Sequence, residues 1–187
     1  MPLIKSISGF RGTIGGKADN GLTPIDIVKL TSSFICLIRR SGVSRPRIVV
    51  GRDGRLSGTM VNQLVCGNLQ AMGADVIDIG LSTTPTVEVA VTEMKADGGV
   101  ILTASHNPRE WNALKLLNNR GEFISKEDGE WLLEKAASDD YEFAYIDEIG
   151  TYSVENDWIE RHADMVCQLP LVNKEIIARA NLKVVVD

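Results

Sequence analysis

Hydrophobic positions along the chain follow two patterns, one typical of helices and one typical of buried strands. From Thr23 to Arg40 they recur every three or four residues, with Thr23 as a capping residue and Pro24 at the first helical position. This pattern predicts a helix over 23–40. A short β-branched run at 47–51, bounded by a proline and a turn-rich loop, predicts a strand.

The same alternation continues toward the middle of the chain. Ser57 is expected to cap a second helix that ends at Gly73, and Thr84 with Pro85 is expected to begin a third. Further strands are expected at 75–80, 99–103 and 113–117. Strands and helices that alternate through short loops are the signature of right-handed βαβ units.

Only nine residues separate the last two of these strands, so no crossover helix fits between them and the strand at 113–117 should run antiparallel. Ser125 is expected to cap a fourth helix. The predicted fold class is α/β, a three-layer α/β/α domain with a mixed, mostly parallel four-stranded sheet over residues 1–150.

Residues 151–187 are interpreted as linker helices and the first strand of a truncated second domain. Helices are expected at 156–169 and 170–180, and a buried strand is expected to begin at 182–186. A lone strand needs a partner, and none follows in the sequence. The alternative is that this strand docks on the edge of the first sheet.

Composition narrows the class of protein. The chain has 187 residues, 24% of them charged and 44% hydrophobic, which is neither a disordered nor a membrane composition. No secretory signal is recognisable, and Cys36, Cys66 and Cys167 are odd in number and far apart. We therefore expect reduced cysteines, no zinc site, no membrane partner and a cytoplasmic location.

The net charge of −5 conceals a basic first third. Residues 1–60 carry ten Lys or Arg against three Asp or Glu. Nucleic-acid binding would interleave such charges with aromatic residues, and only Phe10 and Phe34 are aromatic there, so no nucleic-acid partner is expected. The basic residues instead cluster in glycine-rich loops, which more often hold a phosphate.

Three segments carry candidate chemistry. The loop at 51–58, with Arg52 and Arg55, leads from a strand into a helix N-terminus and is either an anion site or a salt-bridged turn. The loop at 103–108 holds Ser105 beside His106, and its plain alternative is a turn in which polar side chains satisfy the backbone.

The third segment is 8–16, where four glycines surround Arg11. It indicates close approach of the chain to an anion, or simply a flexible tail. The Gly-x-Ser-x-Gly elbow of α/β-hydrolases and the Walker phosphate loop do not occur in the sequence.

These segments resemble the motifs of the α-D-phosphohexomutases, the superfamily of phosphoglucomutase, phosphomannomutase and phosphoglucosamine mutase. Thr103–Pro108 resembles the phosphoserine loop, Gly51–Arg55 the Gly-x-Asp-x-Arg segment, and Ser8–Gly12 the end of the Ser-Gly-x-Arg-Gly signature. Two departures are that 5–7 does not match the start of that signature and that Ala113 stands where the family often has glycine.

The resemblance implies roles for individual residues. Ser105 would carry the phosphoryl group, Arg11 would neutralise it, and His106 with Lys115 would transfer protons and stabilise phosphate. Substrate or phosphate contacts are implied for Arg52, Arg55, Asn107 and Asn112. Mg²⁺ would contact Ser105 through its phosphoryl group, with the remaining ligands beyond Asp187, and a hexose 1,6-bisphosphate would act as activator.

The implied activity is reversible transfer of phosphate between C1 and C6 of a hexose phosphate, through a phosphoserine and a 1,6-bisphosphate intermediate. The 187 residues alone are expected to be inactive. The alternatives are a non-catalytic, anion-binding regulatory module and a serine hydrolase. Neither the sugar nor the oligomeric state follows from the sequence.

Overall fold

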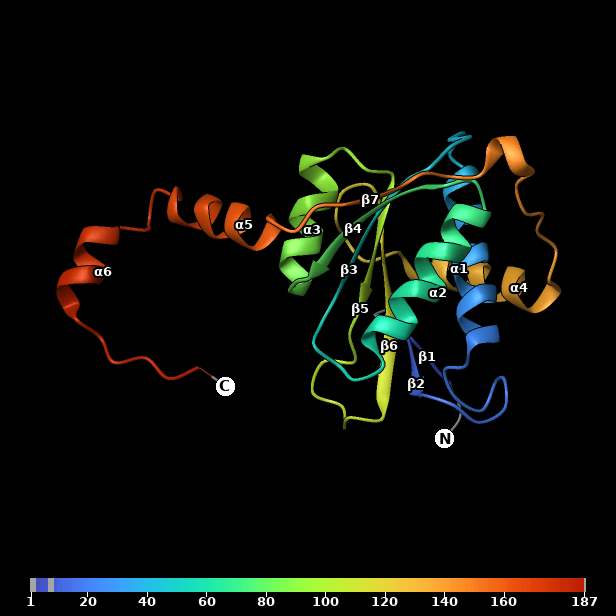
Figure 1. The fold of residues 1–187 in the computed structure, drawn as a ribbon, viewed down its shortest axis with the longest axis horizontal. Helices are drawn as coiled ribbons and strands as arrows, with labels where there is room; N and C mark the ends of the chain where they lie inside the picture. The colour runs from blue at the N-terminus through green and yellow to red at the C-terminus, as the bar shows by residue number, and fades with distance from the viewer. Residues whose placement is uncertain (1–2, 7–8, 187) are drawn as a thin grey trace.

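The computed structural model describes residues 3–6 and 9–186, and its centre is one mixed sheet (Figure 1). The four expected strands are present, and the last two are antiparallel as expected. They are β3 (Arg47–Arg52), β4 (Asp75–Leu81), β5 (Gly98–Leu102) and β6 (Trp111–Leu117).

The sheet has seven strands rather than four, in the order β1-β2-β6-β5-β3-β4-β7. The additional strands are β1 (Ile4–Ser6), β2 (Gly9–Thr13) and β7 (Tyr152–Val154). β2 contains two glycines and β7 is short and exposed, so neither has the alternating apolar pattern that marks a strand in a sequence. The strands β3, β4, β5 and β7 are parallel, whereas β6, β2 and β1 join through antiparallel pairs.

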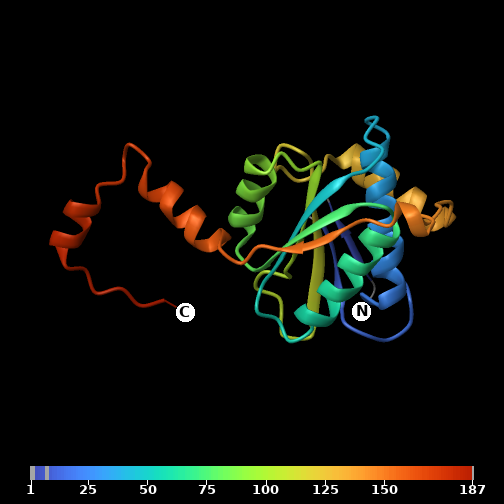
Figure 2. The same cartoon turned by 45° about the horizontal axis from the view of Figure 1, so that its top comes forward.

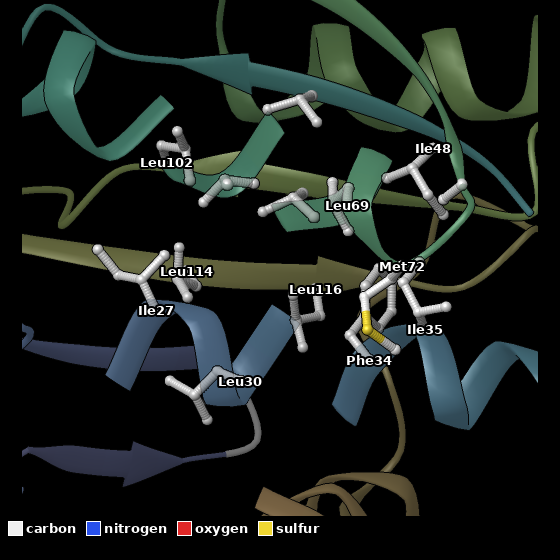
Figure 3. Close-up of a cluster of buried hydrophobic side chains, with 14 of the residues drawn as sticks. Ile27, Leu30, Phe34, Ile35, Ile48, Leu69, Met72, Leu102, Leu114 and Leu116 are labelled. Carbon is white, nitrogen blue, oxygen red and sulfur yellow. The ribbon is translucent and has the colours of Figure 1, made fainter. Parts of the chain in front are cut away.

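Helices cover both faces of the sheet, which makes the three layers expected from the sequence (Figures 1 and 2). On one face α1 (Pro24–Arg39), α2 (Gly58–Ala71) and α4 (Lys126–Ser138) bury the larger core. α3 (Thr84–Glu93) and α5 (Trp158–Cys167) bury a second cluster. Figure 3 shows the larger core, where Phe34 of α1, Leu69 of α2 and Leu116 of β6 are almost completely buried.

Capping residues explain most helix starts. Thr23 and Asp26 form a reciprocal capping box at α1, and the Ser125 side chain accepts a hydrogen bond from the Asp128 N–H at α4. Thr83, one residue earlier than expected, caps α3. Ser57 precedes α2 but makes no capping hydrogen bond, so that prediction was wrong.

The chain beyond the sheet runs away from it (Figures 1 and 2). α5 and α6 (Lys174–Ala180) form within the two expected helical segments. The expected strand at 182–186 does not form, and Val185 is 88% exposed. The place beside β4 is occupied by β7, which also extends the sheet beyond residue 150. Among the described residues, no helix has the length and apolar character needed to cross a membrane.

Candidate functional site

A cavity of about 210 Å³ lies where the loop after β5 meets β2 and β6. Parallel pairing of β3 with β5 brings the loops after both strands to the same edge of the sheet, and β2 joins beside β6. The cavity is lined by Gly9, Arg11, Thr103, Ala104, Ser105, His106, Ala113 and Lys115. The structure therefore brings together the four residues expected to be catalytic.

Ser105 stands at the tip of its loop with its side chain exposed. Its φ of +54° is uncommon for a residue with a side chain. The Ser105 N–H donates to Thr103 Oγ1 at 3.0 Å, and Ser105 Oγ lies 3.4 Å from His106 Nδ1. This contact is long for a hydrogen bond to a hydroxyl, yet it places an imidazole within reach of the serine proton.

Arg11 enters the cavity from β2, opposite Ala113 of β6. One of its amino groups lies 3.5 Å from Asn107 Oδ1, and its Nε is buried without a hydrogen-bond partner. A buried donor on a cation is costly to leave unpaired, so an anion at this point would satisfy it. Asn107 contacts Arg11 but is not among the residues that line the cavity.

Lys115 supplies a second positive charge from β6. Its Nζ lies 5.8 Å from the centre of the Phe123 ring, within the range of a weak cation–π contact. The cavity lining contains two cationic side chains, Arg11 and Lys115, and neither Asp nor Glu among its described residues. Burial raises the pKa of the nearby Glu88 carboxyl, while the charge of Lys115 acts in the opposite direction. The site therefore favours an anion.

Gly9 lines this cavity and Phe123 contacts Lys115, although sequence reasoning named neither as a site residue. A Cβ on Gly9 would lie 2.5 Å from the Leu114 carbonyl oxygen and 3.1 Å from Lys115 Cγ. The glycines around Arg11 were a signal for such a close approach, whereas nothing in the sequence marks Phe123. Ser8, in the same expected signature, lies outside the described residues, as does Asp187.

Arg55, for which a phosphate contact is expected, is not among the residues that line the cavity. Its two amino groups donate to the carbonyl oxygens of Ser105, Asn107, Pro108 and Trp111 at 2.7–3.0 Å. Its Nε lies 3.3 Å from Asp53 Oδ2. The guanidinium therefore binds the backbone of the loop between β5 and β6, residues 103–110, which we call the serine loop, and the first residue of β6.

Arg52 and Asn112 also lie outside the cavity lining. Arg52 Nη1 donates to the Asp53 carbonyl oxygen at 3.2 Å, near the start of α2. Asn112 is completely buried, and its Nδ2 donates to Ser57 Oγ at 3.0 Å. The structure therefore places Asn112 away from the cavity, and its expected contact with a substrate stays a prediction.

A family profile described as "Phosphoglucomutase/phosphomannomutase, alpha/beta/alpha domain I" matches residues 4–142. A protein named phosphoglucomutase/phosphomannomutase from Thermococcus kodakarensis is 41% identical over 141 residues, which are 74% of this chain and 31% of that protein. A phosphoglucosamine mutase from Nautilia profundicola is 36% identical over 154 residues, covering 81% of this chain and 34% of that protein.

The fold itself has a solved counterpart. A phosphoglucomutase/phosphomannomutase family protein from Burkholderia thailandensis superimposes with a TM-score of 0.73 at 24% identity, over 91% of this chain and 38% of that structure. The chain thus spans about a third of the length of the relatives it matches. With the profile match over most of its length, the chain belongs to the phosphoglucomutase/phosphomannomutase family and corresponds to its α/β/α domain I.

Proposed function

We propose that this chain is the phosphoserine-bearing part of a phosphohexomutase, which moves phosphate reversibly between C1 and C6 of a hexose phosphate. One observation carries the proposal. Ser105 projects from its loop into a cavity whose described lining holds two cations and no carboxylate. Transfer of a phosphoryl group depends mainly on positioning and on neutralising charge, and this cavity offers both.

Each residue of the site has a separate role in the proposed transfer. Ser105 Oγ accepts a phosphoryl group from a hexose 1,6-bisphosphate, so a bond from Oγ to phosphorus forms and the bond from phosphorus to the sugar oxygen breaks. His106, 3.4 Å away, takes the serine proton, and the leaving sugar oxygen gains one. In reverse, a sugar hydroxyl takes the phosphoryl group from Ser105. Arg11 and Lys115 stabilise the negative charge throughout.

Mg²⁺ is part of this proposal only through the phosphoryl oxygens of Ser105. Mg²⁺ prefers six oxygen ligands and usually takes carboxylates from protein. No group of three or more potential metal-binding side chains occurs among the described residues, and no carboxylate lines the cavity. These residues therefore do not form a magnesium site by themselves.

The substrate and the extent of the active protein are also proposals. The two named relatives carry the names of enzymes for different sugars, so a hexose phosphate is the narrowest class that we propose. Because the chain spans about a third of their length, we propose that these 187 residues alone do not turn over substrate. We propose the cytoplasm as the compartment, which three free cysteines support.

The test is phosphoryl transfer to Ser105 in the full-length enzyme, because these 187 residues alone are proposed not to turn over substrate. Incubation of that enzyme with glucose 1,6-bisphosphate should add the mass of one phosphoryl group, and peptide mapping should place it on Ser105. Ser105→Ala should abolish this addition, whereas Ser44→Ala, which changes a serine outside the cavity, should not. Binding of the bisphosphate without transfer would instead indicate a non-catalytic phosphate-binding module. Labelling of Ser105 by a fluorophosphonate would indicate a hydrolase.

A further inference from the structure

Arg55 gathers the backbone of the serine loop around one guanidinium group. Nη2 donates to the Ser105 and Asn107 carbonyl oxygens at 2.7 and 2.8 Å, and Nη1 donates to those of Pro108 and Trp111 at 2.8 and 3.0 Å. A guanidinium has five N–H donors, of which these bonds use four. The fifth, on Nε, faces the Asp53 carboxylate.

This arrangement leaves neither amino group of Arg55 available to a phosphoryl group, and its buried Nε, which makes no hydrogen bond, lies 3.3 Å from the negative charge of Asp53 Oδ2. The side chain is only 10% exposed, so an incoming anion could reach an amino group only by displacing a carbonyl of the loop. The hydrogen bonds to the Asn107 and Trp111 carbonyls are partly buried, so water would replace the arginine less readily there than at the exposed Ser105 and Pro108 carbonyls. The contact is therefore part of the loop and is not a vacant subsite.

The loop needs such support. It leaves β5 at Leu102 and re-enters the sheet at Trp111, with Ser105 held at a φ of +54° between them. The trans peptide bond that turns the Ser105 carbonyl toward Arg55 also turns the His106 N–H to the opposite side. Arg55 thereby fixes the orientation of the peptide group between Ser105 and His106, and with it the directions of their side chains.

A second contact joins the same two loops at their base. Asn112 Nδ2 donates to Ser57 Oγ, so the segment around Arg55 and the end of the serine loop are held together at two points. The Asp53 carboxylate also accepts a hydrogen bond from the backbone N–H of Arg55 at 3.0 Å, and this bond shapes the turn from which the arginine side chain projects. The loop after β3 and the loop after β5 are thus joined by side-chain hydrogen bonds into one structural unit.

We propose that Arg55 is a positioning residue for phosphoryl transfer, which holds Ser105 in place through the loop backbone without touching the phosphoryl group. This inference rests on the proposed function for its kinetic consequence but not for its structural one. It assigns the two arginines of the segment separate roles, since Arg55 binds the serine loop whereas Arg52 remains near the α2 N-terminus.

Replacement of Arg55 by lysine separates geometry from charge. Lys keeps the positive charge but has a single nitrogen with three donors, so it cannot bind four carbonyls in a planar fork. A role through charge predicts that Arg55→Lys stays close to wild type and that Arg55→Gln does not. A role through positioning predicts that both variants are impaired.

The kinetic arm uses the full-length enzyme and measures by intact mass, across bisphosphate concentrations, how fast Ser105 acquires a phosphoryl group from glucose 1,6-bisphosphate. Arg55→Lys and Arg55→Gln should each lower the maximal rate at least about tenfold, with the half-saturating concentration changed less than about threefold. Arg45→Lys, at the opposite edge of the sheet, is the control and should not slow transfer. A wild-type rate in Arg55→Lys, or a loss confined to the half-saturating concentration, would overturn the proposal.

The structural arm measures backbone amide hydrogen exchange at 104–111. Both Arg55 variants should exchange faster in this segment and at wild-type rates in α1; unchanged exchange in the loop would overturn the proposal. Asp53→Asn, which keeps the four arginine donors, provides a milder variant that should accelerate the same amides less. If wild-type Ser105 acquires no phosphoryl group, the proposed function fails, and the exchange result still decides whether Arg55 holds the loop.

Discussion

Gly9 of β2 lies directly against Lys115 of β6, so that a Cβ on Gly9 would come within 3.1 Å of Lys115 Cγ. The same Cβ would lie 2.5 Å from the Leu114 carbonyl oxygen, and the φ of Gly9 is +124°. The absence of a side chain at Gly9 is therefore what lets the lysine stem cross this part of the sheet to the cavity. Gly9 thus allows β2 to pack closely against β6 and leaves room for the Lys115 side chain to reach the cavity.

Substitution of Gly9 by alanine should disturb both features. The contact with the Leu114 carbonyl is with rigid backbone, so we expect a loss of about 1–3 kcal/mol in the free energy of unfolding, measured by urea denaturation. Gly15→Ala is the matched control, because Gly15 also has a positive φ of 98° but nothing lies within 4 Å of its Cβ position. Equal losses in the two variants would mean that backbone strain alone accounts for the effect.

The central part of the fold could be predicted because burial leaves a periodic trace in the sequence. α1 and the strands β3 and β5 bury nearly every apolar residue that the pattern identified. β2 leaves no such trace, because it contains Gly9 and Gly12 and forms through pairing with β6. The strand expected at 182–186 has the composition of a strand but no neighbour to pair with in the described residues.

The site could be predicted in its location but not in all its contacts. Parallel strands deliver their loops to one edge, which placed Ser105 and Arg55 together. A sequence gives the charge of Arg55 but not the direction of its side chain. The direction of the Asn112 side chain, in contrast, could have been predicted from strand periodicity. Residues at odd separation on β6 point to opposite faces of the sheet, and Lys115, three residues later, faces the cavity.

The hydrogen bond between Asn112 and Ser57 should contribute to stability rather than to substrate binding. Asn112→Ala removes a completely buried amide and leaves Ser57 Oγ without this donor, so we expect a loss of about 1–3 kcal/mol in the free energy of unfolding. A double-mutant cycle with Ser57→Ala measures the coupling between the two side chains. Additive losses would argue against a direct interaction.

Asp75 should make the protein sensitive to acid. The Arg45 guanidinium, which binds this carboxylate in a bidentate pair, and the Thr151 N–H and hydroxyl hold the pKa of Asp75 well below its usual range. A carboxyl with a depressed pKa in the folded state stabilises the protein above the ordinary value of about 3.9, and this stability is lost as the pH falls below it.

Asp75→Asn removes this titration, so the variant should be less stable than wild type at neutral pH, with the difference shrinking below about pH 4. Urea denaturation at several pH values measures it. Glu122→Gln is the control, because Arg120 and Asn118 also lower the pKa of Glu122 but the pair is exposed at the surface. A constant difference between wild type and Asp75→Asn across the pH range would contradict this assignment.

Tyr152 should make the attachment of β7 sensitive to alkali. Its hydroxyl donates to the buried Asp78 carboxylate at 2.8 Å, and burial together with this hydrogen bond raises the pKa of Tyr152 to about 12. Because the folded-state pKa lies above the ordinary value of about 10, the stabilisation is complete below pH 10 and is lost as the pH rises toward 12.

Tyr152→Phe should therefore increase amide hydrogen exchange at β7 (Tyr152–Val154) at neutral pH, and it should remove the alkaline loss of β7 protection seen in wild type. Tyr145→Phe is the control, because Tyr145 is 81% exposed. An identical alkaline transition in wild type and Tyr152→Phe would show that another group is responsible.

Arg11 should act directly on the phosphoryl group, in contrast to Arg55. Arg11 lines the same cavity as Ser105, whereas Arg55 does not, and the Arg11 Nε is buried in that position without a hydrogen-bond partner. Arg11→Gln removes the charge and should slow phosphorylation of Ser105 by glucose 1,6-bisphosphate by about a hundredfold. Because Arg11 faces the anion rather than the loop, amide exchange at 104–111 should change less than in Arg55→Lys.

Arg47→Gln, at the opposite end of β3, controls for the general loss of a positive charge and should leave the transfer rate unchanged. Similar exchange profiles for Arg11→Gln and Arg55→Lys would contradict the division of roles between the two arginines.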